Sequence, residues 1–152
     1  MNYDINAVLE GVGSVLAGTG YTNIYVSNRQ QGIKTPCFFI SLIPGGIKDE
    51  VDGRYLEDLG LDIVFLQDPN IVNATDNIFN VLSYIDENLA TIPYTDGDES
   101  DPIPLHTYER EYHMEGMELH YQLHIKNRVH IAKTETKMAS LEELTYEIKV
   151  KH

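Results

Sequence analysis

The residues best suited to chemistry are histidines gathered in the last third of the chain. The stretch MELHYQLHIKNRVHI, from Met117 to Ile131, holds three of the six histidines, and two more lie just upstream, giving the set His106, His113, His120, His124 and His130. Imidazole nitrogens are common zinc ligands. The cluster therefore raises the hypothesis of a small metal-dependent hydrolase that uses these histidines.

The spacing of the residues around the histidines argues against a metal site. Apolar residues of this stretch share one parity: Met117, Leu119, Tyr121, Leu123, Ile125, Val129 and Ile131. This period of two predicts a strand with one buried face, and it puts the histidines with Glu, Gln, Lys and Arg on the solvent face. His120 and His124 would lie about 13 Å apart along such a strand, too far to share one zinc unless a third ligand came from the paired strand. We therefore predict histidines that face solvent, and no metal ligand.

Other residue types that catalyse reactions lack the arrangement that catalysis needs. Cys37 is the only cysteine, and its position beside FFISLI favours a small buried hydrophobe. Acidic pairs such as Glu142-Glu143 lie in polar runs, which favours solvated charge. The segment GVGSVLAGTG lacks both the dinucleotide-binding pattern and the GxSxG elbow, so its glycines are interpreted as helical positions packed closely against a neighbour. We predict no catalytic residue and no cofactor.

Composition and charge narrow the function classes further. The 152 residues fit one domain. The formal net charge of −13 disfavours tight binding to phosphates, which depends on clustered Lys and Arg. No apolar run approaches the roughly 20 residues that cross a bilayer, and the N-terminus lacks a basic leading segment, so we expect no membrane partner and a cytoplasmic location.

Two helices are predicted from apolar stripes. The first covers Asp4 to Ala17, with Asp4 as its cap and Gly18 and Gly20 at its end. The second covers residues 69–89 and is opened by Asp68-Pro69.

Strands account for most of the remaining chain. A short strand, Ile24 to Ser27, precedes the apolar strand Cys37 to Ile43, which returns through the alternating strand Tyr55 to Phe65. The turn signal Asp52-Gly53 predicts a long antiparallel hairpin with its tip near Lys48 to Arg54. Two further strands cover Leu105 to Met114 and Met117 to Ile131. The predicted fold class is α+β, a mostly antiparallel sheet with a long β-hairpin packed against two helices.

Two segments are predicted to lie outside this framework. Ile92 to Pro104, IPYTDGDESDPIP, is expected to be an exposed loop, and it does not match the EF-hand calcium pattern. Residues 132–152 are expected to form a C-terminal extension, either a helical turn from Ser140 with a strand from Thr145 to Val150, or an arm that orders on a neighbour. Residues 1–131 then form the domain.

Two features of the chain indicate a known family. One is the order of its elements: helix, strand, long hairpin, helix, acidic loop and two long strands. The other is the stretch SNRQQGIKTPCFFISLIPGGIKDEVDGRYLEDLGLDIVF. In both respects the chain resembles the tail terminator proteins of tailed bacteriophages and phage-derived tail particles. The resemblance spans roughly residues 3–131. Its most characteristic parts are QGIKTPCFFI, the entry to the first core strand, and YLEDLGLDIVFL, the return strand.

The resemblance implies a non-enzymatic subunit of a hexameric ring. Such a ring sits on the tail tube, stops tube polymerisation and provides the interface to the head connector, the sheath or both. The implied partners are copies of the chain, the tube protein, and sheath and head-connector proteins, with DNA only passing through the channel. The implied location is the host cytoplasm during assembly and then the tail or neck of the virion. Another neck or tail-completion protein is the nearest alternative.

Two surfaces are candidates for these contacts. The hairpin tip is either an ordinary solvated turn or a contact with a neighbouring subunit or the tube, made by Lys48, Asp49, Glu50, Asp52 and Arg54. The acidic loop would let DNA pass without adhering if it faces the channel, through Asp96, Asp98, Glu99 and Asp101.

Overall fold

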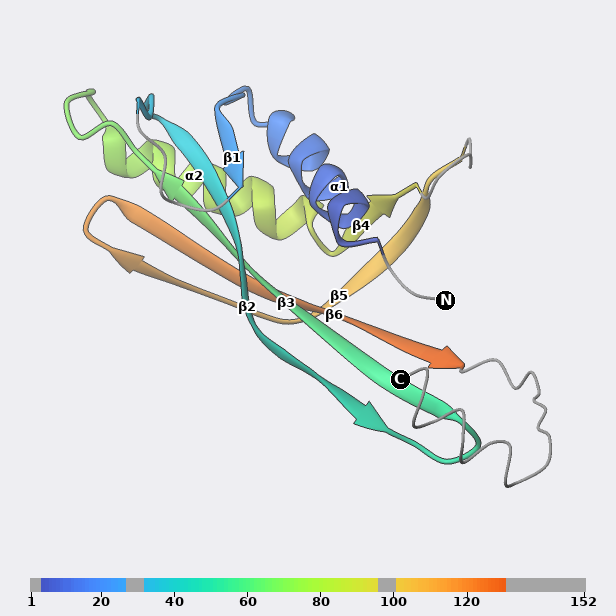
Figure 1. Cartoon of the computed structure of the whole chain (residues 1–152). Helices are drawn as coiled ribbons and strands as arrows, with labels where there is room; N and C mark the ends of the chain where they lie inside the picture. Colours follow the sequence, from blue (N-terminus) through green and yellow to red (C-terminus); the bar gives the residue numbers. More distant parts are fainter. Residues whose placement is uncertain (1–3, 27–31, 96–100, 131–152) are drawn as a thin grey trace.

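In the part of the chain that the structure describes, a six-stranded sheet carries two helices on one side (Figure 1). The computed structural model describes residues 4–26, 32–95 and 101–130, with the backbone only at residues 129 and 130. The elements are α1 (Ile5–Ala17), β1 (Ile24–Val26), β2 (Cys37–Asp49), β3 (Arg54–Leu66), α2 (Ala74–Asn88), β4 (Thr91–Tyr94), β5 (Ile103–Glu115) and β6 (Glu118–His130). The spatial order is β1-β2-β3-β6-β5-β4, and only the β1–β2 pair is parallel. The predicted α+β class is confirmed.

Helix α1 begins and ends where the sequence predicts. The Asn6 amide donates to Asp4 Oδ1 at 3.0 Å, which makes Asp4 the N-cap, and Gly18 is the C-cap. Gly11 packs so closely on β4 that an added Cβ would lie 2.0 Å from the carbonyl oxygen of Pro93. Gly13 has no such neighbour. The interpretation of close packing is therefore right for Gly11 and wrong for Gly13.

Helix α2 begins later than predicted, at Ala74 instead of residue 69. Asp68 Oδ1 accepts from the Asn70 amide at 2.9 Å, so Asp68 closes a local turn and does not cap the helix. Asn73 then adopts φ +62°, a left-handed conformation that Asn tolerates, directly before the first helical turn.

The long hairpin is confirmed and extends beyond the helices. β2 and β3 pair from Cys37 opposite Leu66 to Asp49 opposite Tyr55, with an irregularity between Ile43 and Gly46. Strand β6 pairs with β3 along its whole length. Beyond the core these strands form a projection that we call the hairpin arm, defined as residues 42–60 together with the end of β6 that pairs with them (Figure 1).

The core lies between the two helices and one face of the sheet. The helices bury apolar residues against inward-facing strand residues, and Tyr121 of β6 joins them while its hydroxyl donates to Asp86 Oδ1 of α2 at 2.9 Å. The predicted parity of β6 is confirmed by its buried residues, Leu119, Tyr121, Leu123 and Ile125.

The segment predicted as a loop from Ile92 to Pro104 contains structure at both ends. Strand β4 covers its start and β5 begins at Ile103, with Pro93 opposite Pro104. Ile92 and Tyr94 are buried, so the prediction of an exposed loop is wrong for the start of this segment. Residues 96–100 and the predicted C-terminal extension at 132–152 lie outside the described residues.

Within the described ranges no helix has both the length and the apolar character needed to span a membrane.

Candidate functional site

The outer face of the sheet, opposite the helices, holds the histidines of β6. His120 and His124 lie on this face, as the parity of the strand requires, but they are not open to solvent. Their side chains are only 16% and 19% exposed. The prediction of solvent-facing histidines is therefore right about the face and wrong about the exposure, because the flanking strands cover the imidazoles.

Carboxylates on β3 pair diagonally with both histidines. His120 Nδ1 lies 3.2 Å from Asp62 Oδ2, and His124 Nδ1 lies 2.8 Å from Asp58 Oδ1. The alternation of Asp58, Gly60 and Asp62 places these acids on the same face as the histidines. Gly60 lies opposite His124, and an added Cβ there would meet the imidazole Cε1 at 3.2 Å.

The other side of His120 faces the turn between β5 and β6. His113 of β5 lies directly opposite His120, and the two rings are stacked with centroids 4.8 Å apart. Glu115 Oε2 lies 3.4 Å from His113 Nε2, while Glu115 Oε1 lies 3.5 Å from His120 Nε2. Glu118 Oε1 lies 3.2 Å from the same His120 nitrogen. We call His113, Glu115, Glu118 and His120 the turn cluster.

The electrostatic surroundings of His120 favour its charged form. Burial lowers the pKa of its imidazole, but hydrogen bonds and charge from Asp62, Glu118 and Glu115 outweigh burial and raise the pKa above its ordinary value. A proton on His120 is thus stabilised by three carboxylates.

The backbones of His106 and His130 lie elsewhere in the sheet. His106 is exposed at the start of β5, opposite Thr91. His130 ends β6 opposite Arg54, and its side chain lies outside the described part of the chain. Cys37 is buried, and burial raises the pKa of its thiol, the opposite of what a nucleophile needs.

The predicted contact residues of the hairpin tip do lie together at the end of the hairpin arm. Asp52 and Gly53 form the turn with φ of +64° and +69°. Glu50 is engaged within the chain, because Arg128 Nε and a second guanidinium nitrogen donate to its two carboxylate oxygens at 2.7 and 3.1 Å. This hydrogen bond lowers the pKa of Glu50 and raises the pKa of Arg128. The tip is thus tied to β6.

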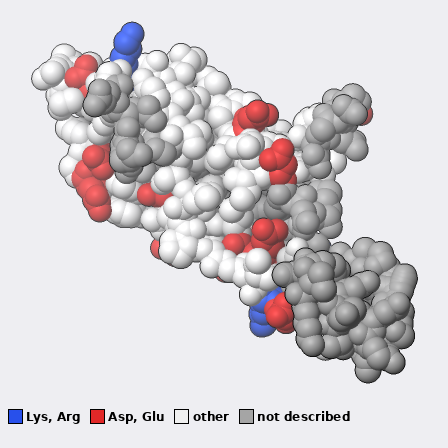
Figure 2. Space-filling view, viewed as in Figure 1, with Lys and Arg blue, Asp and Glu red and all other residues white. Residues whose placement is uncertain are grey.

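Among the charged side chains on the face that Figure 2 shows, acidic ones predominate. They occur along most of that face, whereas Lys and Arg appear only toward its two ends. Of the acidic loop, Asp101 is exposed, and Asp96, Asp98 and Glu99 lie outside the described residues. The structure therefore places one of the four predicted loop acids at the surface.

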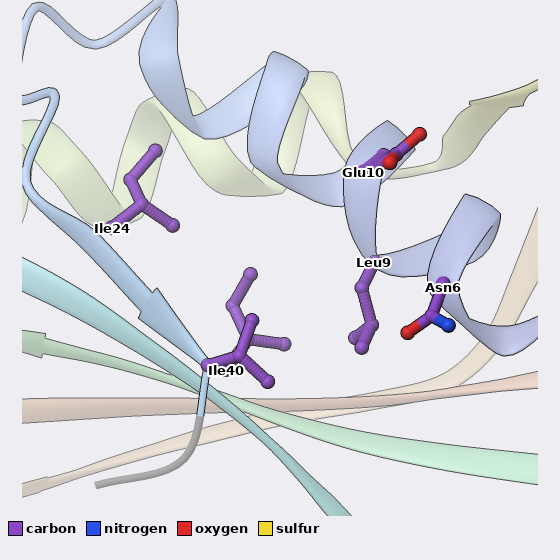
Figure 3. Close-up of a pocket in the computed structure, with 6 residues that line it drawn as sticks. Asn6, Leu9, Glu10, Ile24 and Ile40 are labelled. Atoms are coloured by element: carbon purple, nitrogen blue, oxygen red, sulfur yellow. The ribbon is translucent and has the colours of Figure 1, made fainter.

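A hollow of about 490 Å³ lies between α1 and the β1 edge of the sheet, lined by Asn6, Leu9, Glu10, Ile24, Val26 and Ile40. Figure 3 shows Leu9 pointing from α1 toward the sheet that carries Ile40, while the carboxylate of Glu10 points away. Glu10 is the one titratable group of this lining. Such a mainly aliphatic surface holds no pair of groups for acid–base chemistry.

The fold thus defines an α+β domain whose long, partly uncovered strands carry no assembled catalytic group among the described residues. The sequence profile of a family described as phage tail terminator protein matches residues 5–137, and the chain belongs to this family. It is a structural component of a phage-type tail.

Comparison with solved structures finds a similar chain in the virion of a native gene transfer agent particle. The identity is 14%, the match covers 80% of this chain and 96% of that one, and the TM-score is 0.41. No curated protein matches the chain in a direct sequence comparison.

Proposed function

We propose that the chain forms a closed ring, expected to be hexameric, on the end of the tail tube, where it stops tube polymerisation and provides the interface to the head connector, the sheath or both. The observation that carries this proposal is the hairpin arm. It extends away from the helices, and few of its residues contribute to the hydrophobic core. An arm of this kind is suited to contact a neighbouring subunit.

The arm offers both apolar surface and an open strand edge. Leu42, Ile47 and Val51 are exposed on it. Strand β1 pairs only with Phe38 to Ile40 of β2, so within the described residues the outer edge of β2 beyond Ile40 carries no further strand. Exposed apolar residues along an open edge favour pairing with another chain. A head-to-tail contact of this type closes into a ring without forming fibres when the rotation between subunits allows it.

The charge of the chain supports a channel through which DNA passes without being bound. The net charge of −13 is repulsive toward phosphates. The acidic loop containing Asp96, Asp98, Glu99 and Asp101 would add to this repulsion if it lined the channel. The contact residues of the arm would be Lys48, Asp49, Asp52 and Arg54, with Glu50 holding the tip in place through Arg128.

Two valines allow a matched test of the arm. Val51 at the tip is 72% exposed, and Val72, in the connection between β3 and α2, is 83% exposed. Mass measurement and negative-stain imaging would be performed on the wild type, V51K and V72K, each alone and with tube protein. We expect rings that cap tubes for the wild type and V72K, and a loss of rings and of tube-length control for V51K, because a buried lysine disrupts an apolar contact.

Either of two results would contradict the proposal. A wild-type protein that stays monomeric with tubes present would remove the ring itself. If V51K and V72K assembled into rings equally well, the hairpin arm would not be the contact surface. Ring formation would then depend on other parts of the chain.

A further inference from the structure

We propose that the turn cluster is a binding site for a borderline transition-metal ion of the zinc class, held by His113, Glu115 and His120 with Glu118 as the fourth ligand. This inference does not rest on the ring or on its contacts. The site lies at the β5–β6 turn, at the opposite end of the sheet from the hairpin tip (Figure 1).

The spacing of the donor atoms matches a metal tetrahedron. Two ligands at about 2.0–2.1 Å from one zinc at the tetrahedral angle lie about 3.3 Å apart. The three carboxylate-to-imidazole distances in the turn cluster are close to this value, at 3.4 Å (His113 to Glu115 Oε2), 3.5 Å (His120 to Glu115 Oε1) and 3.2 Å (His120 to Glu118). One donor atom from each of His113, Glu115 and His120 falls within 4.8 Å of the others. Side-chain rotations are needed to bring these donors and Glu118 around one ion, and the exposed His113 and Glu115 side chains have room to make them.

The surroundings of His120 supply a second, independent argument. Imidazoles that bind metal through one nitrogen usually donate from the other to a carboxylate, which fixes the ring. Asp62 Oδ2 lies 3.2 Å from His120 Nδ1, so His120 Nε2 is directed toward Glu115 and Glu118. Asp62 in turn is held on β3, a central strand of the sheet.

The ligand chemistry selects the class of metal. Two imidazoles and two carboxylates suit zinc, cobalt or nickel, whereas magnesium and calcium prefer oxygen ligands only. Four ligands from the protein would complete a tetrahedral site, which is the arrangement of structural zinc and leaves no position for substrate. The bound ion would cross-link β5, β6 and their turn, and it would not make the chain a hydrolase.

Titration of the untagged, full-length, chelator-treated protein with ZnCl₂ tests this inference, with calorimetry for stoichiometry and the visible spectrum of added Co²⁺ for tetrahedral geometry. We expect one ion per chain and a rise in Tm with zinc. The variant H113Q changes an exposed side chain and should keep the fold while losing stoichiometric binding. D62N should keep the ligands but weaken binding about 10–100-fold.

The exposed His106 of the same strand provides the matched control. H106Q should bind zinc as the wild type does, because His106 is remote from the turn cluster along β5. Binding below one ion per chain, equal binding by H113Q and the wild type, or an octahedral Co²⁺ spectrum would each overturn the proposal. None of these results bears on ring formation, which the V51K comparison tests separately.

Discussion

Two glycines on one turn of α1 should respond in opposite directions to the same substitution. Replacing glycine by alanine in a helix interior stabilises the helix by about 1 kcal/mol when nothing opposes the new methyl group. Gly13 meets this condition, because a Cβ there would have no atom within 4 Å apart from its chain neighbours and the backbone of its own helix. We therefore expect G13A to raise the free energy of unfolding by about 1 kcal/mol.

At Gly11 the same methyl group would meet the backbone of β4. Its Cβ would lie 2.0 Å from the Pro93 carbonyl oxygen and 3.0 Å from Ile92 Cγ2. Non-bonded heavy atoms are comfortable only at about 3.5 Å, so α1 must move by more than 1 Å from a backbone atom that cannot rotate away. Overpacking of this severity costs about 3 kcal/mol, which exceeds the gain in helix propensity and leaves G11A destabilised by about 2 kcal/mol.

Thermal and urea unfolding followed by circular dichroism, at one protein concentration, measure both effects. For a chain of this length 1 kcal/mol corresponds to about 2–4 °C in Tm. G11A should therefore lower Tm by about 4–8 °C, and G13A should raise it by about 2–4 °C. A Tm for G11A equal to or above that of the wild type would refute the close contact between α1 and β4.

Two further predictions concern buried polar groups. Burial and Asp86 raise the pKa of Tyr121 to about 12, so the native state keeps the phenol neutral while the unfolded chain ionises near pH 10. The resulting contribution to the unfolding free energy is complete below pH 10 and is lost as the pH rises toward 12. It amounts to about 2–3 kcal/mol and is measured as the unfolding free energy against pH. Thr107 Oγ1 donates to the Leu89 carbonyl at 2.6 Å, so T107V should lower the unfolding free energy by about 1–3 kcal/mol because a buried acceptor loses its donor.

Each of these predictions has a conservative control. Y121F has no ionisable group, and its unfolding free energy should stay flatter between pH 10 and 12; a slope equal to that of the wild type would assign the alkaline transition to other tyrosines. T107S keeps the hydroxyl and should lose less stability than T107V. If T107V were as stable as T107S, the hydrogen bond to Leu89 would contribute nothing measurable.

The elements that the sequence predicts correctly are those with strong local patterns. The parity of β6, the Asp4 cap and the turn signal at Asp52-Gly53 each depend on residues close in the chain, and each appears in the structure. Prediction from local patterns fails where the same residues are typical of two different local structures. Asp68-Pro69 is typical of a helix start, yet Asp68 closes a turn and α2 begins after Asn73.

Strand β4 escapes prediction because its cause lies elsewhere in the chain. Thr91 to Tyr94 contains a proline, pairs with a segment that contains another, and follows a helix directly. Prolines are depleted in strand interiors and tolerated at edges, and β4 is an edge of the sheet. Its burial comes from α1, since Gly11 allows the helix to approach the Pro93 carbonyl. A contact between residues 11 and 93 cannot be predicted from the sequence around either residue.

The turn cluster shows which of its residues can be placed together from the strand register that the sequence predicts. The spacing along β6 predicts that His120 and His124 lie too far apart to share an ion, and it leaves open a ligand from the paired strand. Counting outward from Glu115-Gly116, the two residues between the predicted strands, with Glu115 opposite Glu118, places His113 opposite His120, as the structure has it. The same counting fails below the irregularity between Tyr108 and Glu111. The low exposure of the two His–Asp pairs cannot be predicted by this counting either. It depends on β3, and no turn signal specifies that β3 lies beside β6. A candidate metal site could therefore be located from sequence at the turn, where register is fixed locally, while the Asp62 carboxylate that orients His120 required the fold.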